Sequence, residues 1–123
     1  MRNLKKTIVI IDDENEILSM LSRFLSRHEN YTVTTFSDPL LAINSLPKET
    51  DLVLLDIMMP QMNGLDVLPL ILKKQPKTKV LMMTAYSTLD KVLNAHRHGA
   101  QNYIMKPFNS LEILGKKIEE ILK

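Results

Sequence analysis

The chain has no cysteine among its 123 residues, which excludes a disulfide framework and any thiol chemistry. No apolar run is longer than four residues, too short for a transmembrane helix or for the core of a signal peptide. The N-terminal MRNLKK segment is basic, but the apolar segment after it is also too short for export. These absences predict a soluble protein of the cytoplasm that does not bind membranes.

The sequence also has little excess charge, with a formal net charge of +2 at pH 7. A nucleic-acid-binding domain would normally carry a larger and more localised basic excess. Lys73, Lys74, Lys77 and Lys79 lie close together, but they flank an expected connection between a helix and a strand. We interpret them as solvated charge and expect no nucleic acid to bind this domain itself.

Five short apolar, β-prone runs are present, and helical patterns separate them. The runs are at residues 7–11, 31–36, 51–55, 79–83 and 101–105. Alternating units of this length predict a parallel sheet with helices on both faces, an α/β fold of five βα units. The runs do not alternate in polarity, as is typical of strands that are covered on both faces. With no linker, repeat or low-complexity segment, residues 1–123 are expected to form one domain.

Helices are indicated by apolar spacing and by capping residues. Stripes at helical spacing are Ile17/Leu21/Phe24/Leu25, Leu65/Leu68/Leu72 and Leu111/Leu114/Ile118/Ile121/Leu122. Asp38 is expected to cap the second helix with Pro39 in its first position, and Asn109 to cap the fifth. A fourth helix is expected over residues 87–98. Pro69 should kink the third helix or delay its regular part, because it lacks a backbone donor.

Polar side chains stand at the ends of four of the five runs. Asp12 and Asp13 follow the first run, Asp56 follows the third, and Thr84 and Lys106 end the fourth and fifth. The carboxyl ends of parallel strands share one edge of the sheet, and ligands bind beyond that edge. Alone, Asp13 would more often be the N-cap of the next helix, an alternative that the sequence leaves open. The coincidence of all five favours one shared site.

Three crowded carboxylates are electrostatically costly. Two like charges about 4 Å apart repel by roughly 4 kcal/mol at an effective dielectric constant near 20. The group should therefore raise its pKa values or recruit a hard dication, with Mg²⁺ preferred and Mn²⁺ also suitable. A carboxylate beside such an ion can attack a phosphoryl group. We predict that Asp56 is this nucleophile, that Asp12 and Asp13 hold the metal, and that Thr84 and Lys106 contact phosphoryl oxygens.

Four segments, IIDDE, LLDIMMPQMNG, MMTAYS and YIMKPF, resemble in order and spacing the CheY-like receiver domain of two-component response regulators. The resemblance covers the chain from about Lys6 to Lys123. It implies a flavodoxin-like sheet of strand order 2-1-3-4-5 and a phosphoacceptor at Asp56. It also implies a sensor histidine kinase or a histidine phosphotransfer protein as the phosphoryl donor in a phosphorelay.

The resemblance places further roles on single residues. The backbone carbonyl that binds the metal, together with Asp56, falls on Met58. The switch hydroxyl falls on Thr84, followed by the usual small residue, Ala85, and the switch aromatic falls on Tyr103. A half-buried strand aromatic without a switching role is the alternative for Tyr103.

Further roles are implied in the same way. The invariant lysine falls on Lys106, and the lysine–proline peptide bond of the family, typically cis, falls on Lys106–Pro107. Met58 and Tyr86 stand where acidic or amide side chains orient the hydrolytic water in similar receivers, beside Ala85. Neither side chain suits that task, so we expect a long-lived phosphorylated form.

The resemblance implies a signalling module that catalyses only its own phosphorylation and dephosphorylation. Phosphorylation would shift the population between two packings of one surface, formed by the fourth helix, the fifth strand and the fifth helix. That surface would control an output partner or domain and could also form a homodimer.

Three other functions fit the sequence less well. A haloacid-dehalogenase-like phosphatase carries a D-x-D motif after its first strand. Here the candidate nucleophile, Asp56, comes at the third apolar run, and Met58 stands at the position of the second aspartate. An FMN-binding flavodoxin-like module needs a hydroxyl-rich phosphate loop, and IDDEN would repel phosphate. A receiver that only binds partners would have lost part of the motif set, and nothing is missing.

Overall fold

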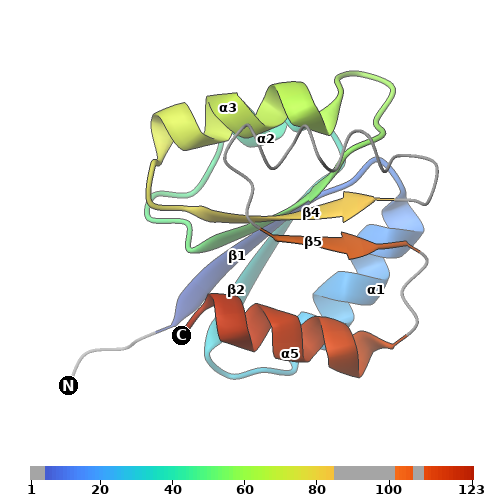
Figure 1. The fold of residues 1–123 in the computed structure, drawn as a ribbon, viewed down its shortest axis with the longest axis vertical. Helices are drawn as coiled ribbons and strands as arrows, with labels where there is room; N and C mark the ends of the chain where they lie inside the picture. The colour runs from blue at the N-terminus through green and yellow to red at the C-terminus, as the bar shows by residue number, and fades with distance from the viewer. Residues whose placement is uncertain (1–4, 85–101, 107–109) are drawn as a thin grey trace.

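The computed structural model of the chain describes residues 5–84, 102–106 and 110–123 (Figure 1). The strands are β1 (Lys6–Ile11), β2 (Tyr31–Phe36), β3 (Leu52–Asp56), β4 (Lys79–Thr84) and β5 (Asn102–Met105). The helices are α1 (Asn15–Ser26), α2 (Pro39–Asn44), α3 (Gly64–Lys74) and α5 (Leu111–Ile121). The helix predicted at 87–98 lies outside the described residues.

All five strands are parallel and form one sheet in the order β2-β1-β3-β4-β5. This confirms the predicted α/β class and strand order. The sheet separates two helical layers, with α1 and α5 on one face and α2 and α3 on the other (Figure 1). None of the described helices is long and apolar enough to cross a membrane.

The sheet has a hydrophobic core on each face because successive strand residues point to opposite sides. Val53 and Leu55 of β3 pack with Val67 and Ile71 of α3 on one face. On the other face Leu54 belongs to the cluster that contains the α1 and α5 side chains. All five residues of β3 are buried, as the unbroken apolar run predicts for a central parallel strand.

Capping explains where the helices begin. Asp38 caps α2 and accepts a hydrogen bond from the Leu40 N–H, as predicted. The prediction for the last helix was wrong by one residue: Ser110, not Asn109, caps α5 and accepts bonds from the N–H groups of Glu112 and Ile113.

Pro69 does not delay the third helix. Helix α3 begins at Gly64, where the Asn63 side chain caps it, and Pro69 lies on its exposed side. A proline inside a helix removes one backbone donor, and on the exposed side water can satisfy the carbonyl group that loses its partner.

Candidate functional site

The site lies at the carboxyl edge of the sheet, where backbone hydrogen bonds extend the strand pairing by one residue. The Asp12 N–H donates to the Phe36 carbonyl at 3.2 Å, and the Lys106 N–H donates to the Thr84 carbonyl at 2.6 Å. The sheet therefore fixes the Cα positions of the candidate residues at β1 and β5. Asp56 is itself the last residue of β3.

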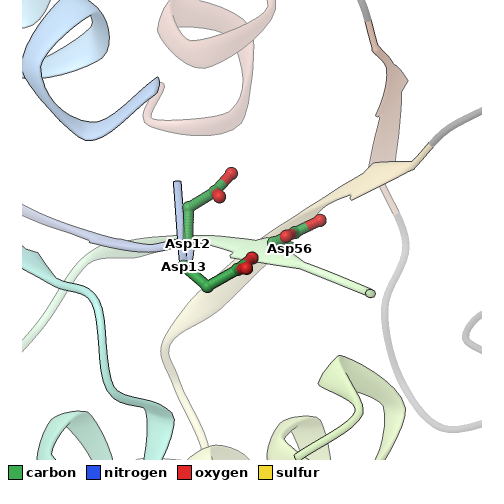
Figure 2. Close-up of side chains that lie close together, drawn as sticks. All are labelled: Asp12, Asp13 and Asp56. Carbon is green, nitrogen blue, oxygen red and sulfur yellow. The ribbon is translucent and has the colours of Figure 1, made fainter. Parts of the chain in front are cut away.

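Asp12, Asp13 and Asp56 are brought together at this edge (Figure 2). Each offers a carboxylate oxygen, and these oxygens lie within 4.8 Å of one another. Asp12 is fully buried, Asp56 is 5% exposed, and Asp13 is partly buried. The N-cap position of α1 is Glu14, so the alternative in which Asp13 caps that helix is wrong.

Lys106 supplies positive charge to the cluster from the end of β5. Its Nζ atom lies 2.6 Å from Asp12 Oδ2 and 3.4 Å from Asp56 Oδ1. The lysine side chain is 15% exposed, so these ion pairs are largely shielded from water. It is closer to Asp12 than to Asp56, and Asp56 is correspondingly less neutralised.

Burial raises the pKa of Asp56 to about 7, and the negative charge of Asp12 adds to this rise. Lys106 opposes the rise through its charge and its proximity. The pKa of Asp12 is also raised, chiefly by burial, against the hydrogen bond from Lys106. Burial lowers the pKa of Lys106, but its contacts with Asp12 and Asp56 outweigh burial, and the net shift is upward.

Gly64 lets the end of β3 and the start of α3 approach closely. A Cβ atom at this position would lie 2.2 Å from the Asp56 carbonyl oxygen and 2.8 Å from the Ile57 Cα atom. The Gly64 N–H donates to the Ile57 carbonyl at 2.8 Å and closes the loop after Asp56. The glycine in the MMPQMNG segment is thus required by backbone contact beside Asp56.

The other predicted residues are placed as follows. Thr84 is buried at the end of β4, in register with Met105 of the edge strand. Tyr103 is 46% exposed on β5, and the Met58 side chain is 53% exposed just beyond Asp56. Ala85, Tyr86 and Pro107, for which modulating roles or a cis bond were predicted, lie outside the described residues.

Glu14 is a member of the site that the sequence did not single out. Its Oε1 atom lies 3.4 Å from Lys106 Nζ, and its backbone N–H donates to Asp12 Oδ1 at 2.9 Å. Its position directly after Asp12 and Asp13 was the available signal. A contact between residues 92 positions apart cannot be read from that signal.

The donor set suits a hard divalent cation. The three carboxylates are close enough to share one ion, and burial raises the pKa values of two of them, Asp12 and Asp56. Such a set of oxygen donors matches the coordination that Mg²⁺ prefers. One lysine cannot neutralise this many acids. Asp12, Asp13 and Asp56 are therefore the residues that would hold such an ion.

The family model of the response regulator receiver domain matches residues 8–118. The chain is 39% identical over 117 residues to the transcriptional regulatory protein CpxR of Escherichia coli K12, covering 94% of this chain and 49% of CpxR. It is 38% identical over 113 residues to the DNA-binding transcriptional regulator NtrC of Proteus hauseri, covering 89% of this chain and 23% of NtrC. The chain thus spans half or less of the length of these relatives.

Solved structures agree with this match. The BeF3-activated receiver domain of DrrB, a Thermotoga maritima protein, superposes with a TM-score of 0.86 at 30% identity, covering 96% of this chain and 97% of that one. A CheY-like receiver domain protein of Methanospirillum hungatei gives a TM-score of 0.81 at 32% identity, covering 95% and 94%.

Proposed function

Because the chain belongs to the response regulator receiver family, we propose that it is a phosphoacceptor module that takes a phosphoryl group onto Asp56. The donor would be a sensor histidine kinase or a histidine phosphotransfer protein. The observation that carries this proposal is the gathering of Asp12, Asp13 and Lys106 around a single acid at the end of the central strand.

The chemistry follows from the charges at the site. An Asp56 carboxylate oxygen attacks phosphorus, the bond between phosphorus and the donor nitrogen breaks, and the leaving imidazole takes up a proton. Mg²⁺ (or Mn²⁺) bound by the three aspartates, with the Met58 carbonyl as a further ligand, would offset the negative charge of the incoming group. Lys106, already 3.4 Å from Asp56, would pair with a phosphoryl oxygen.

Asp56 must be ionised to attack, and its raised pKa of about 7 shows that the charged form is costly in the isolated site. Partial ionisation at neutral pH is enough for reaction, and a neighbouring cation would increase it. The reactivity of the acid therefore depends on neutralisation of the charge around it.

The signal would leave the site through β4 and β5. Thr84 ends β4 next to the edge strand, and Tyr103 stands partly exposed on that strand. A phosphoryl group at Asp56 would attract the Thr84 hydroxyl and favour an inward position of Tyr103. The β5–α5 surface would then bind an output partner or domain, or a second copy of the chain.

The module would catalyse only its own phosphorylation and dephosphorylation. The lengths of CpxR and NtrC are consistent with a receiver that controls a further output domain. A phosphorelay fed by a cytoplasmic kinase domain would place this module in the cytoplasm.

The test is direct phosphorylation in solution. Incubation with acetyl phosphate and Mg²⁺ should add one phosphoryl group, detected by intact mass. Asp56→Asn should abolish the addition, whereas Asp66→Asn, at an exposed acid in the first turn of α3, should leave it unchanged. Addition to the Asp56→Asn variant, or none to the wild type, would refute the proposal.

A further inference from the structure

Lys106 is shared among three acids. Besides Asp12 at 2.6 Å, its Nζ atom has Glu14 Oε1 and Asp56 Oδ1 at the same distance, 3.4 Å. A lysine ammonium carries three N–H donors, so it can serve three acceptors at once. Asp12 and Glu14 both accept hydrogen bonds from this ammonium, so two of its contacts draw it toward the residues after β1, against its ion pair with Asp56.

Glu14 occupies an unusual position for its residue type. It is the N-cap of α1, where Ser, Thr, Asp and Asn are preferred, and its side chain makes no capping hydrogen bond. Instead the backbone N–H bonds to Asp12 and the carboxylate reaches Lys106. The backbone N–H and the carboxylate of Glu14 are thus directed to the site, while its carbonyl accepts from the Leu18 N–H at the start of the helix.

The environments of Glu14 and Asp56 differ. The Glu14 side chain is 61% exposed, whereas that of Asp56 is 7% exposed. An exposed carboxylate is well solvated, and its contact with Lys106 does not depend on the burial that governs Asp56. Because the pair is exposed, that attraction is modest and adjusts a rate without locking the lysine.

We propose that Glu14 is a positioning residue that holds the Lys106 ammonium away from Asp56 and thereby slows phosphoryl transfer to it. The inference rests on the proposed phosphorylation of Asp56. During transfer negative charge gathers on the oxygens beside Asp56, and Lys106 must move toward them. Every interaction that holds the lysine elsewhere, including the one with Glu14, opposes that movement.

Three variants separate the contact from its charge. Glu14→Gln removes the charge. Glu14→Asp keeps the charge but shortens the side chain and supplies a preferred N-cap residue, so its carboxylate should turn to the α1 backbone and release Lys106. Glu16→Gln is the control, because it removes a charge from the exposed first turn of α1. Among the described residues, the ion-pair partners of Lys106 are Asp12, Glu14 and Asp56, not Glu16.

The rate of phosphorylation is measured by intact mass over a range of acetyl phosphate concentrations with Mg²⁺. Glu14→Gln and Glu14→Asp should each raise the maximal rate about 1.5- to 5-fold, the effect of losing an exposed ion pair. The half-saturating concentration should not change, and Glu16→Gln should match the wild type. The gain should shrink as salt is raised, because salt screens an exposed pair.

The inference is overturned if either Glu14 variant fails to exceed Glu16→Gln in maximal rate. In particular, the maximal rate could be unchanged in Glu14→Asp but higher in both Glu14→Gln and Glu16→Gln. That result would mean that negative charge near the site slows the reaction in general, without a specific contact to Lys106. A wild-type chain that accepts no phosphoryl group would remove the proposed function as well, which distinguishes the two failures. Circular dichroism of each variant verifies the fold.

Discussion

At the scale of single residues, the site is defined by how incompletely its charges are balanced. Asp56 is buried next to Asp12, and both have raised pKa values because burial penalises their charged forms. Lys106 moderates the effect without removing it. Without a cation, folding therefore has to accommodate acids that would ionise more readily in the unfolded chain.

This imbalance predicts how stability depends on pH. The pKa of Asp56 is about 7 in the folded chain against an ordinary value of 3.8, so the folded state binds the proton more tightly. Its contribution to stability is full below pH 3.8 and is lost as pH rises through 7. In chelator, the free energy of unfolding attributable to this group should fall by on the order of a few kcal/mol between pH 4 and pH 8.

Urea unfolding at several pH values measures this fall. Asp56→Asn should flatten the dependence, since asparagine does not titrate, whereas Asp66→Asn, on the exposed first turn of α3, should keep it. Identical pH profiles for the wild type and Asp56→Asn would contradict the prediction.

A second residue-scale prediction concerns Met58, which is 53% exposed two positions after Asp56. A thioether is a weak hydrogen-bond partner for water, so the phosphorylated form should persist. Met58→Gln should shorten its lifetime several-fold by supplying an amide that can orient water. Leu70→Gln, on an exposed position of α3, is the control. Decay is followed by intact mass after removal of the donor, and equal decay of the wild type and Met58→Gln would contradict the expectation.

At the scale of elements, strands were more predictable than helix ends. A buried parallel strand leaves an unbroken apolar run, and β3 at Leu52–Asp56 differs from the predicted 51–55 by one residue at each end. Helix starts depend on which of several neighbouring polar side chains turns back to the helix. Asn109 and Ser110 are both residue types that can cap, and the sequence does not reveal that Ser110 accepts the hydrogen bonds of the first turn.

The candidate site also has a part that the sequence predicts and a part that it does not. The meeting of Asp12, Asp13 and Asp56 follows from parallel strands sharing an edge, so sequence order was sufficient to predict it. The Lys106–Glu14 contact depends on side-chain reach and on the path of the chain beyond β1. No periodic pattern encodes such a path, and the contact was therefore not predicted.

The junction of β3 and α3 gives a prediction at this scale. Gly64→Ala would place a methyl group 2.2 Å from the Asp56 carbonyl oxygen, and backbone on both sides must shift. We expect a loss of about 3 kcal/mol in the free energy of unfolding. Gly115→Ala is the matched control, because its Cβ atom would meet only the tip of the Phe24 ring at 3.2 Å.

Alanine favours a helix over glycine by about 1 kcal/mol, so Gly115→Ala within α5 should stay within about 1 kcal/mol of the wild type. Urea unfolding measures both variants. A Gly64→Ala variant as stable as Gly115→Ala would show that the β3–α3 junction can open without cost, against this expectation.

At the scale of the whole molecule, the sheet has a core on each face, and the acids meet at one end of it. An ion bound there by Asp12 and Asp13, which follow β1, and by Asp56, which ends β3, would join two strands of the same sheet. It should therefore stabilise the entire cooperative unit and not only the loops that carry its ligands.

We expect Mg²⁺ to raise the free energy of unfolding by about 1.4 kcal/mol at ten times its dissociation constant. Thermal unfolding followed by circular dichroism should show a higher Tm with Mg²⁺ for the wild type and little change for Asp13→Asn. Asp66→Asn should respond like the wild type. A wild-type Tm that is unchanged at any millimolar Mg²⁺ concentration would count against the metal site.

A last prediction follows the signal across the molecule. Phosphorylation should shift the methyl resonances of both Met59, three residues after Asp56, and Met105, on the edge strand. In Tyr103→Ala the Met59 shift should remain, while the Met105 shift should largely disappear because the aromatic ring proposed to relay the change is gone. Equal Met105 shifts with and without Tyr103 would assign this residue a purely structural place.

The complete burial of β3 has one more consequence. The phosphoryl group would be attached to a strand with little room to move, since β1 and β4 flank β3 and helices cover both of its faces. Because β3 itself can hardly move, a phosphoryl group on Asp56 would have to alter the packing of neighbouring strands nearer the sheet edge. The residue that is modified and the surface that a partner contacts would therefore lie in different parts of the molecule.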